Sequence, residues 1–150
     1  MAKAICNMLP VDIRRARADE MAACAALYVR AGDAAFTWRP KGWFTAADFL
    51  RFSNAEEVYV ACSHGAILGL LSFFRPSNFV HALYIDPLAQ GFGIGTALLK
   101  AAEKFASGPL SLKTDEPNIR ARRFYERHGF VTAGDTGVDQ GVKWLRLKRP

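Results

Sequence analysis

The sequence predicts an α+β fold: a mixed, mostly antiparallel central sheet of six to seven strands with helices on both faces, in a three-layer α/β arrangement. Apolar runs of strand length alternate with segments whose apolar residues recur every three to four positions, as on one face of a helix. Gly, Pro, Ser and Asn separate many of these segments. The length of 150 residues suits one domain, so residues 1–150 are expected to form a single domain.

The first part of the chain is expected to form four strands and two helices. The strands are 11–17, 58–62, 67–74 and 79–85. A turn at 63–65 makes the second and third strands an antiparallel hairpin. Asp19 and Glu20 favour a helix start, because acidic side chains stabilise the positive end of the helix dipole. A shorter helix is expected at 45–51, beyond an aromatic-rich loop.

The second part opens with a glycine-rich segment at 90–96. This segment leads directly into an amphipathic helix, which Gly108 and Pro109 are expected to end. A short strand at 110–114 follows. A basic helix then runs from Asn118 to His128 with Gly129 as its cap, and the final strands are expected at 130–133 and 142–147.

Charge is distributed unevenly along the chain. The sequence carries 20 Lys and Arg against 14 Asp and Glu, a net charge of +6. Residues 1–89 hold nine basic and eight acidic residues, whereas residues 90–150 hold eleven basic and six acidic ones. The net-positive second part favours an anionic partner.

Cysteine usage and hydropathy favour a reduced, cytoplasmic protein without a membrane segment. Cys6, Cys24 and Cys62 are too few and too scattered for a disulfide scaffold, and no pair of Cys or His has metal-ligand spacing, so no metal is expected. No apolar run approaches the ~20 residues of a membrane span. The first ten residues lack the apolar stretch of a secretory signal.

The segment from Gln90 to Thr96 has the features of an anion site. Glycines leave backbone N–H groups exposed, and the positive end of the following helix favours phosphate, although a plain strand-to-helix turn also fits. Spacing excludes two known phosphate-binding patterns. A P-loop ends in Gly-Lys-Ser/Thr, and the dinucleotide pattern needs a glycine where Thr96 or Leu98 stands.

Gln90, Gly93 and Gly95 instead match the pattern Gln/Arg-x-x-Gly-x-Gly. With it, the chain resembles the GCN5-related N-acetyltransferases, the GNAT family, over nearly its whole length. The segment 118–130 looks like that family's later motif, Asn-x-x-Ala-x-x-Phe-Tyr-x-x-x-Gly-Phe. The resemblance implies a GNAT-like acyl-CoA N-acyltransferase fold. It also implies acetyl transfer from acetyl-CoA to a primary amine of a small molecule, peptide or protein. The cysteines could suggest a covalent acyl-enzyme, but none has a recognisable His partner, so direct attack in a ternary complex is expected.

The resemblance further implies where acetyl-CoA binds. Backbone N–H groups of the glycine loop would hold the pyrophosphate, and the strand ending at Ile85 would splay from its neighbour and offer backbone groups to the pantetheine amides. Candidates for the 3′-phosphate, or else for a solvated helix face, are Arg120, Arg122, Arg123 and Lys100. The implied coenzyme-binding residues are Leu83, Tyr84, Ile85, Gln90, Gly91, Phe92, Gly93, Ile94, Gly95, Thr96 and Asn118. Asn118 could equally cap its helix.

Acid–base chemistry has two principal candidates. Tyr125 matches the family's usual general acid, because a phenol with an ordinary pKa of about 10 can protonate a thiolate while neutral at pH 7; the alternative is a core tyrosine. His81 begins a His-Ala-Leu segment similar to one that supplies a base in arylalkylamine acetyltransferases, and an imidazole suits that role near neutral pH. The alternative for His81 is a hydrogen-bonded core histidine. Further candidates for the base are Asp33, Glu56 and Glu57.

The acceptor amine is expected to bind at the aromatic-rich loop. Phe36 and Trp38, with Trp43 and Phe44 nearby, could line a pocket for an apolar or aromatic amine, or form a satellite core. Two other functions stay open. The basic segments 120–127 and 143–149 would suit a nucleic-acid-binding module, although no known motif accompanies them, and the same fold could serve as a non-catalytic acyl-CoA sensor. Many members of the family dimerise, so a homodimer is also possible.

Overall fold

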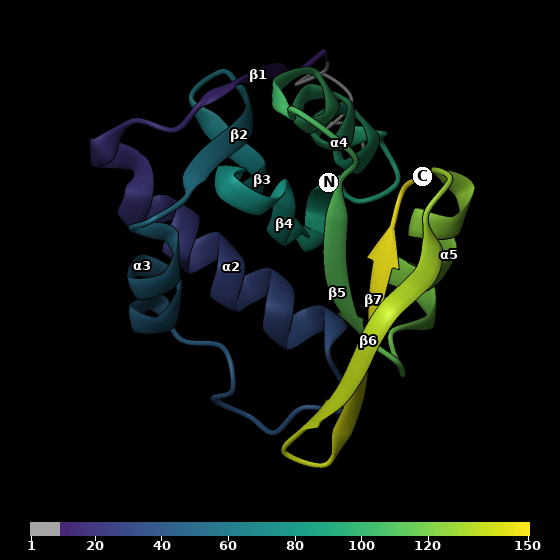
Figure 1. Cartoon of the computed structure of the whole chain (residues 1–150). Helices are drawn as coiled ribbons and strands as arrows, with labels where there is room; N and C mark the ends of the chain where they lie inside the picture. Colours follow the sequence, from purple (N-terminus) through teal and green to yellow (C-terminus); the bar gives the residue numbers. More distant parts are fainter. Residues whose placement is uncertain (1–9) are drawn as a thin grey trace.

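The structure is a computed structural model that describes residues 10–150. Residues 1–9, with Cys6 and most of the segment considered as a secretory signal, lie outside the described residues. Seven strands form one sheet in the order β1-β2-β3-β4-β5-β7-β6 (Figure 1). Neighbouring strands are antiparallel except β4 and β5, which are parallel.

The elements follow the order predicted from the sequence. The strands are β1 (Asp12–Arg15), β2 (Glu57–Ser63), β3 (Ala66–Phe74), β4 (Phe79–Ile85), β5 (Ser111–Asp115), β6 (Val131–Asp139) and β7 (Val142–Lys148). The helices are α2 (Met21–Ala35), α3 (Ala46–Ser53), α4 (Ile94–Phe105) and α5 (Ile119–Arg127). Short 3-10 turns are η1 (Ala18–Glu20), η2 (Arg75–Ser77) and η3 (Pro87–Ala89).

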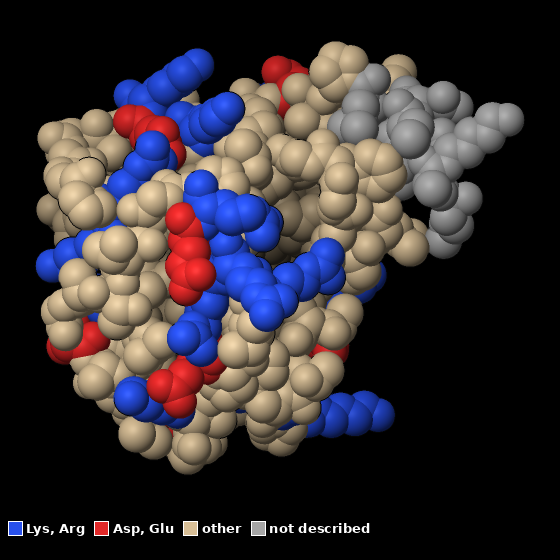
Figure 2. Space-filling model, turned by 90° about the vertical axis from the view of Figure 1, so that its right-hand side faces the viewer, with Lys and Arg blue, Asp and Glu red and all other residues tan. Residues whose placement is uncertain are grey.

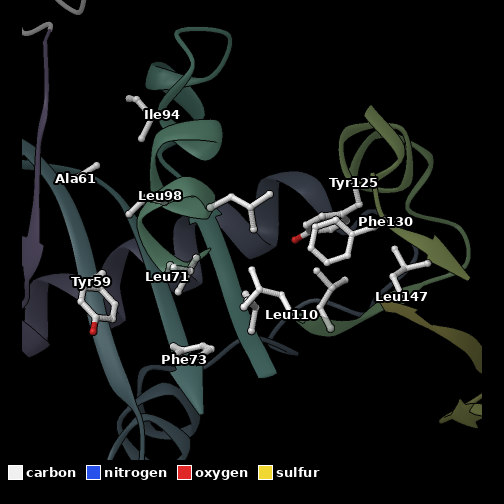
Figure 3. Close-up of a cluster of buried hydrophobic side chains, with 14 of the residues drawn as sticks. Tyr59, Ala61, Leu71, Phe73, Ile94, Leu98, Leu110, Tyr125, Phe130 and Leu147 are labelled. Atoms are coloured by element: carbon white, nitrogen blue, oxygen red, sulfur yellow. The ribbon is translucent and has the colours of Figure 1, made fainter. Parts of the chain in front are cut away.

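Side-chain alternation along the strands builds a separate core on each face of the sheet. On β2, Tyr59 and Ala61 belong to the core beneath α4 and α5, part of which is shown in Figure 3. Val58 and Val60 belong to the core beneath α2 and α3. Because helices cover both faces of a mostly antiparallel sheet, the predicted fold class is confirmed.

Most element boundaries lie within two residues of the prediction, and the ends of β6 and α4 differ further. β6 continues to Asp139 instead of ending near residue 133, because the register irregularity around Gly134 (φ +84°) lets its pairing with β7 resume. α4 ends at Phe105, before Gly108 is reached. The longer β6 ends at Asp139, which lines the cavity of the candidate site.

The parallel β4–β5 pair is where the sheet opens. Its ladder joins only Phe79 to Ser111 and Val80 to Leu112. β4 stays paired with β3 as far as Ile85, so beyond Val80 one edge of β4 has no strand beside it. The strand therefore splays from its neighbour as expected, and the opening forms the candidate site.

β4 also carries a bulge at His81. Ser72 of β3 pairs with Ala82, and Phe73 pairs with Val80, so His81 has no partner of its own on β3. Bulges redirect side chains and are common beside active sites. Val80 and Ala82 consequently face opposite cores, although their even spacing would place them on one face of a regular strand.

Candidate active site

A cavity of about 1150 Å³ lies where β4 and β5 separate. Its walls come from α2 and the loop after it, from β4, from the glycine loop, and from α5 with the end of β5. The predicted site residues on its wall are Phe36, His81, Leu83, Tyr84, Ile85, Gln90, Gly91, Gly93, Ile94, Gly95, Thr96, Asn118 and Tyr125. Two predicted residues are not on the wall: Phe92 packs against the core beneath α4, and Trp38 lies beside Phe36.

The glycine loop leaves backbone donors free at the start of α4. Gly91 and Gly93 have φ values of +87° and +79°, and a β-carbon at either position would meet no atom within 4 Å. Gly93 is the N-cap of α4 and has no capping side chain. The first helical hydrogen bond runs from the Ala97 N–H to the Gly93 carbonyl. The preceding N–H groups therefore lack helical partners, and together with the helix dipole they form an anion site.

His128 fastens the end of α5 to the first turn of α4. Its Nε2 lies 3.0 Å from Thr96 Oγ1, and its Nδ1 lies 2.8 Å from the Phe124 carbonyl oxygen. A carbonyl can only accept a hydrogen bond, so Nδ1 carries a proton. This contact links the end of α5 to Thr96, the last residue of the glycine loop.

The start of α5 is fixed by Asn118, whose Oδ1 accepts a hydrogen bond of 3.1 Å from the Ala121 N–H. Asn118 therefore caps its helix and also lines the cavity, so both roles considered for it are compatible. Arg122 points elsewhere and donates to the Glu116 carbonyl at 2.9 Å. Lys100 is not on the cavity wall.

Three arginines of α5 line the cavity: Arg120, Arg123 and Arg127. Among residues 10–150, no carboxylate lies within salt-bridge distance of any of the three. Figure 2 shows basic side chains gathered beside a hollow on the side of the molecule that holds α5. Guanidinium groups without a carboxylate partner, next to a glycine loop, fit a ligand that carries several phosphates.

Tyr125 joins the core to the cavity. Its residue surface is only 8% exposed, and its ring packs edge-on against Phe124 and Phe130 at centroid distances of 5.3 and 5.5 Å (Figure 3). Burial raises the pKa of the Tyr125 phenol, because the charged form is poorly solvated. The phenol is therefore protonated at neutral pH and lines the cavity as a proton donor.

His81 is an accessible imidazole on the cavity wall. Its side chain is 41% exposed, which argues against the core-histidine alternative. Its Nδ1 lies 2.6 Å from Glu56 Oε2, and its ring stacks on Phe52 at a centroid distance of 4.1 Å. The other candidates for the base, Asp33, Glu56 and Glu57, do not line the cavity.

Aromatic rings from α2, from the loop after it and from β4 form one wall of the cavity. Tyr84 contacts Tyr28, Phe36 and Phe44 at centroid distances of 5.0, 6.0 and 6.2 Å. Phe44 lies directly on Gly32, where a β-carbon would be 2.5 Å from the ring. Burial raises the pKa of Tyr28 to about 12 and holds the pKa of Tyr84 well above its usual value, so both phenols are uncharged at neutral pH.

The loop that supplies Phe36 is fastened to the end of β5. Trp38 donates from Nε1 to Asp115 Oδ2 at 2.8 Å, so this indole N–H faces a carboxylate and not the cavity. Arg39 donates to both oxygens of Asp115, at 3.0 Å from Nε and 3.1 Å from Nη2. The guanidinium also lies over Trp43, 4.1 Å from the ring centroid.

Sequence reasoning missed three supporting residues of the site. Glu56 was considered only as a base, Asp115 was not considered, and His128 had no assigned role. Each acts through a partner distant in the chain, so no local spacing identifies it. The sequence offers only a general signal: a carboxylate or imidazole that becomes buried on folding needs a polar partner, but the sequence does not say which one.

Among residues 10–150, no group of three or more His, Cys, Asp and Glu side chains is placed to share a metal ion. No helix in that range combines the length and apolar character needed to cross a bilayer.

Residues 18–130 match the family described as the acetyltransferase (GNAT) family. The chain is 29% identical over 132 residues to the peptidyl-lysine N-acetyltransferase YjaB of Salmonella typhimurium, a match covering 86% of this chain and 89% of that protein. YjaB of Escherichia coli is likewise 29% identical over 132 residues, covering 86% and 88% of the two chains.

Solved structures share the fold. The solution structure of apo-form YjaB from Escherichia coli has a TM-score of 0.78 at 27% identity, covering 93% of this chain and 97% of that one. The PaiA N-acetyltransferase of Thermoplasma acidophilum, in complex with coenzyme A, has a TM-score of 0.76 at 15% identity, covering 94% and 99%. These findings do not favour a nucleic-acid-binding module or a non-catalytic sensor. The family match spans most of the chain, and the chain therefore belongs to the acetyltransferase (GNAT) family and is an acetyl-CoA-dependent N-acetyltransferase.

Proposed function

We propose that this enzyme acetylates the ε-amine of lysine side chains in peptides or proteins, within a ternary complex of enzyme, acetyl-CoA and acceptor. One observation carries the proposal: a single cavity is lined by the glycine loop, an uncharged aromatic wall, an imidazole and a buried phenol. The names of the YjaB relatives, which are peptidyl-lysine N-acetyltransferases, support the acceptor class.

Acetyl-CoA supplies the activated acetyl group as a thioester, and the residues present fit it. The free N–H groups at the start of α4 and the arginines of α5 would hold its phosphates. The unpaired edge of β4 at Leu83, Tyr84 and Ile85 would bond the pantetheine amides as an added strand does. An N–H on the same edge would stabilise the oxyanion that forms at the carbonyl under attack.

Proton transfer is assigned to His81 and Tyr125. His81 takes a proton from the acceptor ammonium, directly or through water, and the neutral nitrogen can then bond to the acetyl carbon. Tyr125 gives its phenolic proton to sulfur as the carbon–sulfur bond breaks. Burial raises the pKa of Tyr125, so the phenol still carries its proton at neutral pH when the carbon–sulfur bond breaks.

The acceptor side of the cavity suits an amine carried on an apolar stem. Phe36, Phe44, Tyr28 and Phe52 line it, and a lysine side chain would lay its methylenes along these rings. The same wall would take a small aromatic amine, which is the second candidate acceptor. Trp38 would act by holding the loop in place through Asp115.

We further propose that the chain acts as a single N-acetyltransferase domain in the cytoplasm. Cys24 is buried and Cys62 is partly buried, and both are free thiols, as in proteins of reducing compartments. Binding to nucleic acid is not part of the proposal. A homodimer remains a proposal, which light scattering of the purified protein tests.

The test of the acceptor compares three sets of amines under identical conditions. Thiol release from acetyl-CoA and acceptor mass are followed with lysine peptides, with free aromatic monoamines and with α-amino peptides that lack lysine. Lysine peptides are expected to show the largest kcat/KM and a mass gain of one acetyl group on the ε-nitrogen. A higher kcat/KM for aromatic monoamines would overturn the lysine assignment in favour of the second candidate.

Binding of the coenzyme is tested separately by thermal unfolding. At ~100 times Kd, acetyl-CoA should stabilise the fold by about 2.7 kcal/mol. NAD and a short DNA duplex serve as controls that carry phosphates without the pantetheine arm. Equal stabilisation by all three would mean that the site selects charge alone.

A further inference from the structure

The carboxylate of Glu56 lies behind the imidazole of His81 and is almost enclosed. Glu56 has a side-chain exposure of 7%, and its Oε2 is 2.6 Å from His81 Nδ1. Its other oxygen, Oε1, accepts a hydrogen bond of 2.6 Å from the hydroxyl of Ser72, a residue with no exposed surface. Both oxygens of a buried carboxylate are thus satisfied, one by a fixed hydroxyl and one by the imidazole.

This contact sets which nitrogen of His81 carries the proton. An ionised carboxylate only accepts hydrogen bonds, so Nδ1 must be the donor. In the neutral imidazole, Nε2 then holds the free lone pair. A base needs a free lone pair, and the ring nitrogen not bound to Glu56 is the one that can meet a ligand in the cavity.

The ring is also fixed against rotation. Phe52 stacks on His81 with an interplanar angle of 28°. The β-bulge places the backbone of His81 outside the regular β3–β4 pairing, with Ser72 and Ala82 paired beside it. The stacking contact and the hydrogen bond to the carboxylate together favour this orientation of the imidazole.

We propose that Glu56 is a positioning residue for acetyl transfer: it holds His81 in the Nδ1–H tautomer, with Nε2 available to accept the acceptor's proton. This inference rests on the proposed role of His81 as the base. Glu56 does not touch the reacting atoms, and the cavity wall does not include it. Its action is on the tautomer and the direction of the ring.

Three basic side chains of other elements have contacts of their own. Lys113 of β5 lines the same cavity and lies over Trp144, 4.1 Å from its ring centroid. Arg146 of β7 is paired with Asp135, and Arg51 of α3 with Asp48. Among residues 10–150, Glu56 is the one carboxylate within salt-bridge distance of His81.

The test replaces the carboxylate with an amide of the same shape. Glu56→Gln can donate to Nδ1, which favours the Nε2–H tautomer and removes the lone pair from the cavity side. The expected result is a kcat at least 10-fold lower, with the KM for acetyl-CoA within 2-fold of the wild-type value. Nitrogen NMR of the free enzyme should show the His81 ring changing from mainly Nδ1–H to a mixture or to Nε2–H.

Glu57→Gln is the matched control. Glu57 is the next residue, and its carboxylate is also hydrogen-bonded, but to Arg75 and Tyr59 rather than to His81. This variant should keep both kcat and the His81 tautomer of the wild type. Thermal unfolding of each variant checks that the assays are made on folded protein.

A double variant separates this inference from the proposed base. His81→Gln alone should lower kcat, and adding Glu56→Gln should then lower it no further, because Glu56 acts through His81. If His81→Gln is inactive while Glu56→Gln has wild-type kcat and tautomer, the positioning role is wrong and the base stands. A full kcat for His81→Gln would overturn the base assignment and the positioning role with it. If Glu56→Gln lowered kcat by the same factor in the wild type and in the His81→Gln variant, the positioning role of Glu56 would also be wrong.

Discussion

Arg39 and Asp115, 76 residues apart in the chain, form the most enclosed ion pair among residues 10–150. Their side chains are 5% and 13% exposed, and two hydrogen bonds of 3.0 and 3.1 Å join them. The pair holds the loop that carries Phe36 against the end of β5. Both members of the pair line the cavity, so this contact fixes one part of the cavity wall to another.

Removing the Arg39 guanidinium should therefore lower the free energy of unfolding much more than removing a surface charge does. Arg39→Met leaves the Asp115 carboxylate enclosed without its cation, which should lower the free energy of unfolding by about 3 kcal/mol. For a chain of this size, Tm should fall by roughly 6 to 12 °C. Lys143→Met is the control, because Lys143 pairs with Glu116 at 3.4 Å with both side chains nearly half exposed. That control should change stability by less than about 1 kcal/mol, and equal losses in the two variants would contradict the argument.

A substitution in the glycine loop should weaken coenzyme binding, and a control with the same backbone strain can separate this effect from a loss of stability. Gly93→Ala forces a side chain into φ +79° and places a methyl group in the open space beside the free N–H groups. We expect the Kd for acetyl-CoA to rise at least 10-fold, measured by calorimetry. Gly65→Ala, in the β2–β3 turn, also has φ +79° and open space around it. It should lose similar stability, about 1–2 kcal/mol, and keep the wild-type Kd. If both variants bind acetyl-CoA equally well, the loop does not hold the phosphates.

The phenol of Tyr125 should matter for turnover and little for stability. Tyr125→Phe removes only the hydroxyl and is expected to lower kcat by about 100-fold, because a general acid commonly contributes 10²–10⁴. Since burial raises the pKa of Tyr125, the loss should be the same at pH 7 and pH 9. Tyr59→Phe is the matched control, with similar burial (7% against 8%) and its hydroxyl hydrogen-bonded to Glu57 away from the cavity. A Tyr125→Phe enzyme with full kcat would assign the thiolate's proton to another donor.

Acid stability should depend on Glu57. Hydrogen bonds from Arg75 lower the pKa of Glu57 from 4.5 to about 2. The folded pKa lies below the unfolded one, so this carboxylate stabilises the fold above pH 4.5, and the stabilisation disappears as the pH falls from about 4.5 to about 2. Glu57→Gln should therefore unfold more easily than wild type in denaturant at pH 7 and nearly equally at pH 2. A gap between the two proteins that stays constant over this range would contradict the assignment.

Local signals in the sequence predicted much of this molecule. The glycine loop, the Asn118 cap and the left-handed Gly129 (φ +85°) were all identified, because each depends on residues adjacent in the chain. Runs or alternations of apolar residues were sufficient to place the strands other than β6. β6 was predicted too short, because Gly134 and its neighbours have the composition of a turn although pairing with β7 resumes beyond them.

The contacts that assemble the site could not be predicted in the same way. Glu56 and His81 meet across 25 residues, and a bulge in β4 decides on which side His81 lies. A bulge is a relation between two strands, so one strand's sequence does not reveal it. The prediction of Trp38 as an acceptor residue shows the same limit, since its indole N–H is directed to Asp115 by a contact between distant segments.

The short β4–β5 ladder also bears on how such an enzyme can change its preferences over evolution. Phe36, Phe44 and the other rings of the acceptor wall come mainly from the chain before β2, whereas the glycine loop and the arginines of α5 come after β4. The short ladder opens the cavity between the two sets, and Tyr84 and the Arg39–Asp115 pair join them, so substitutions elsewhere in one set leave the other in place. New acceptors can accordingly be acquired by mutation in one portion of the gene while the affinity for acetyl-CoA is inherited unchanged.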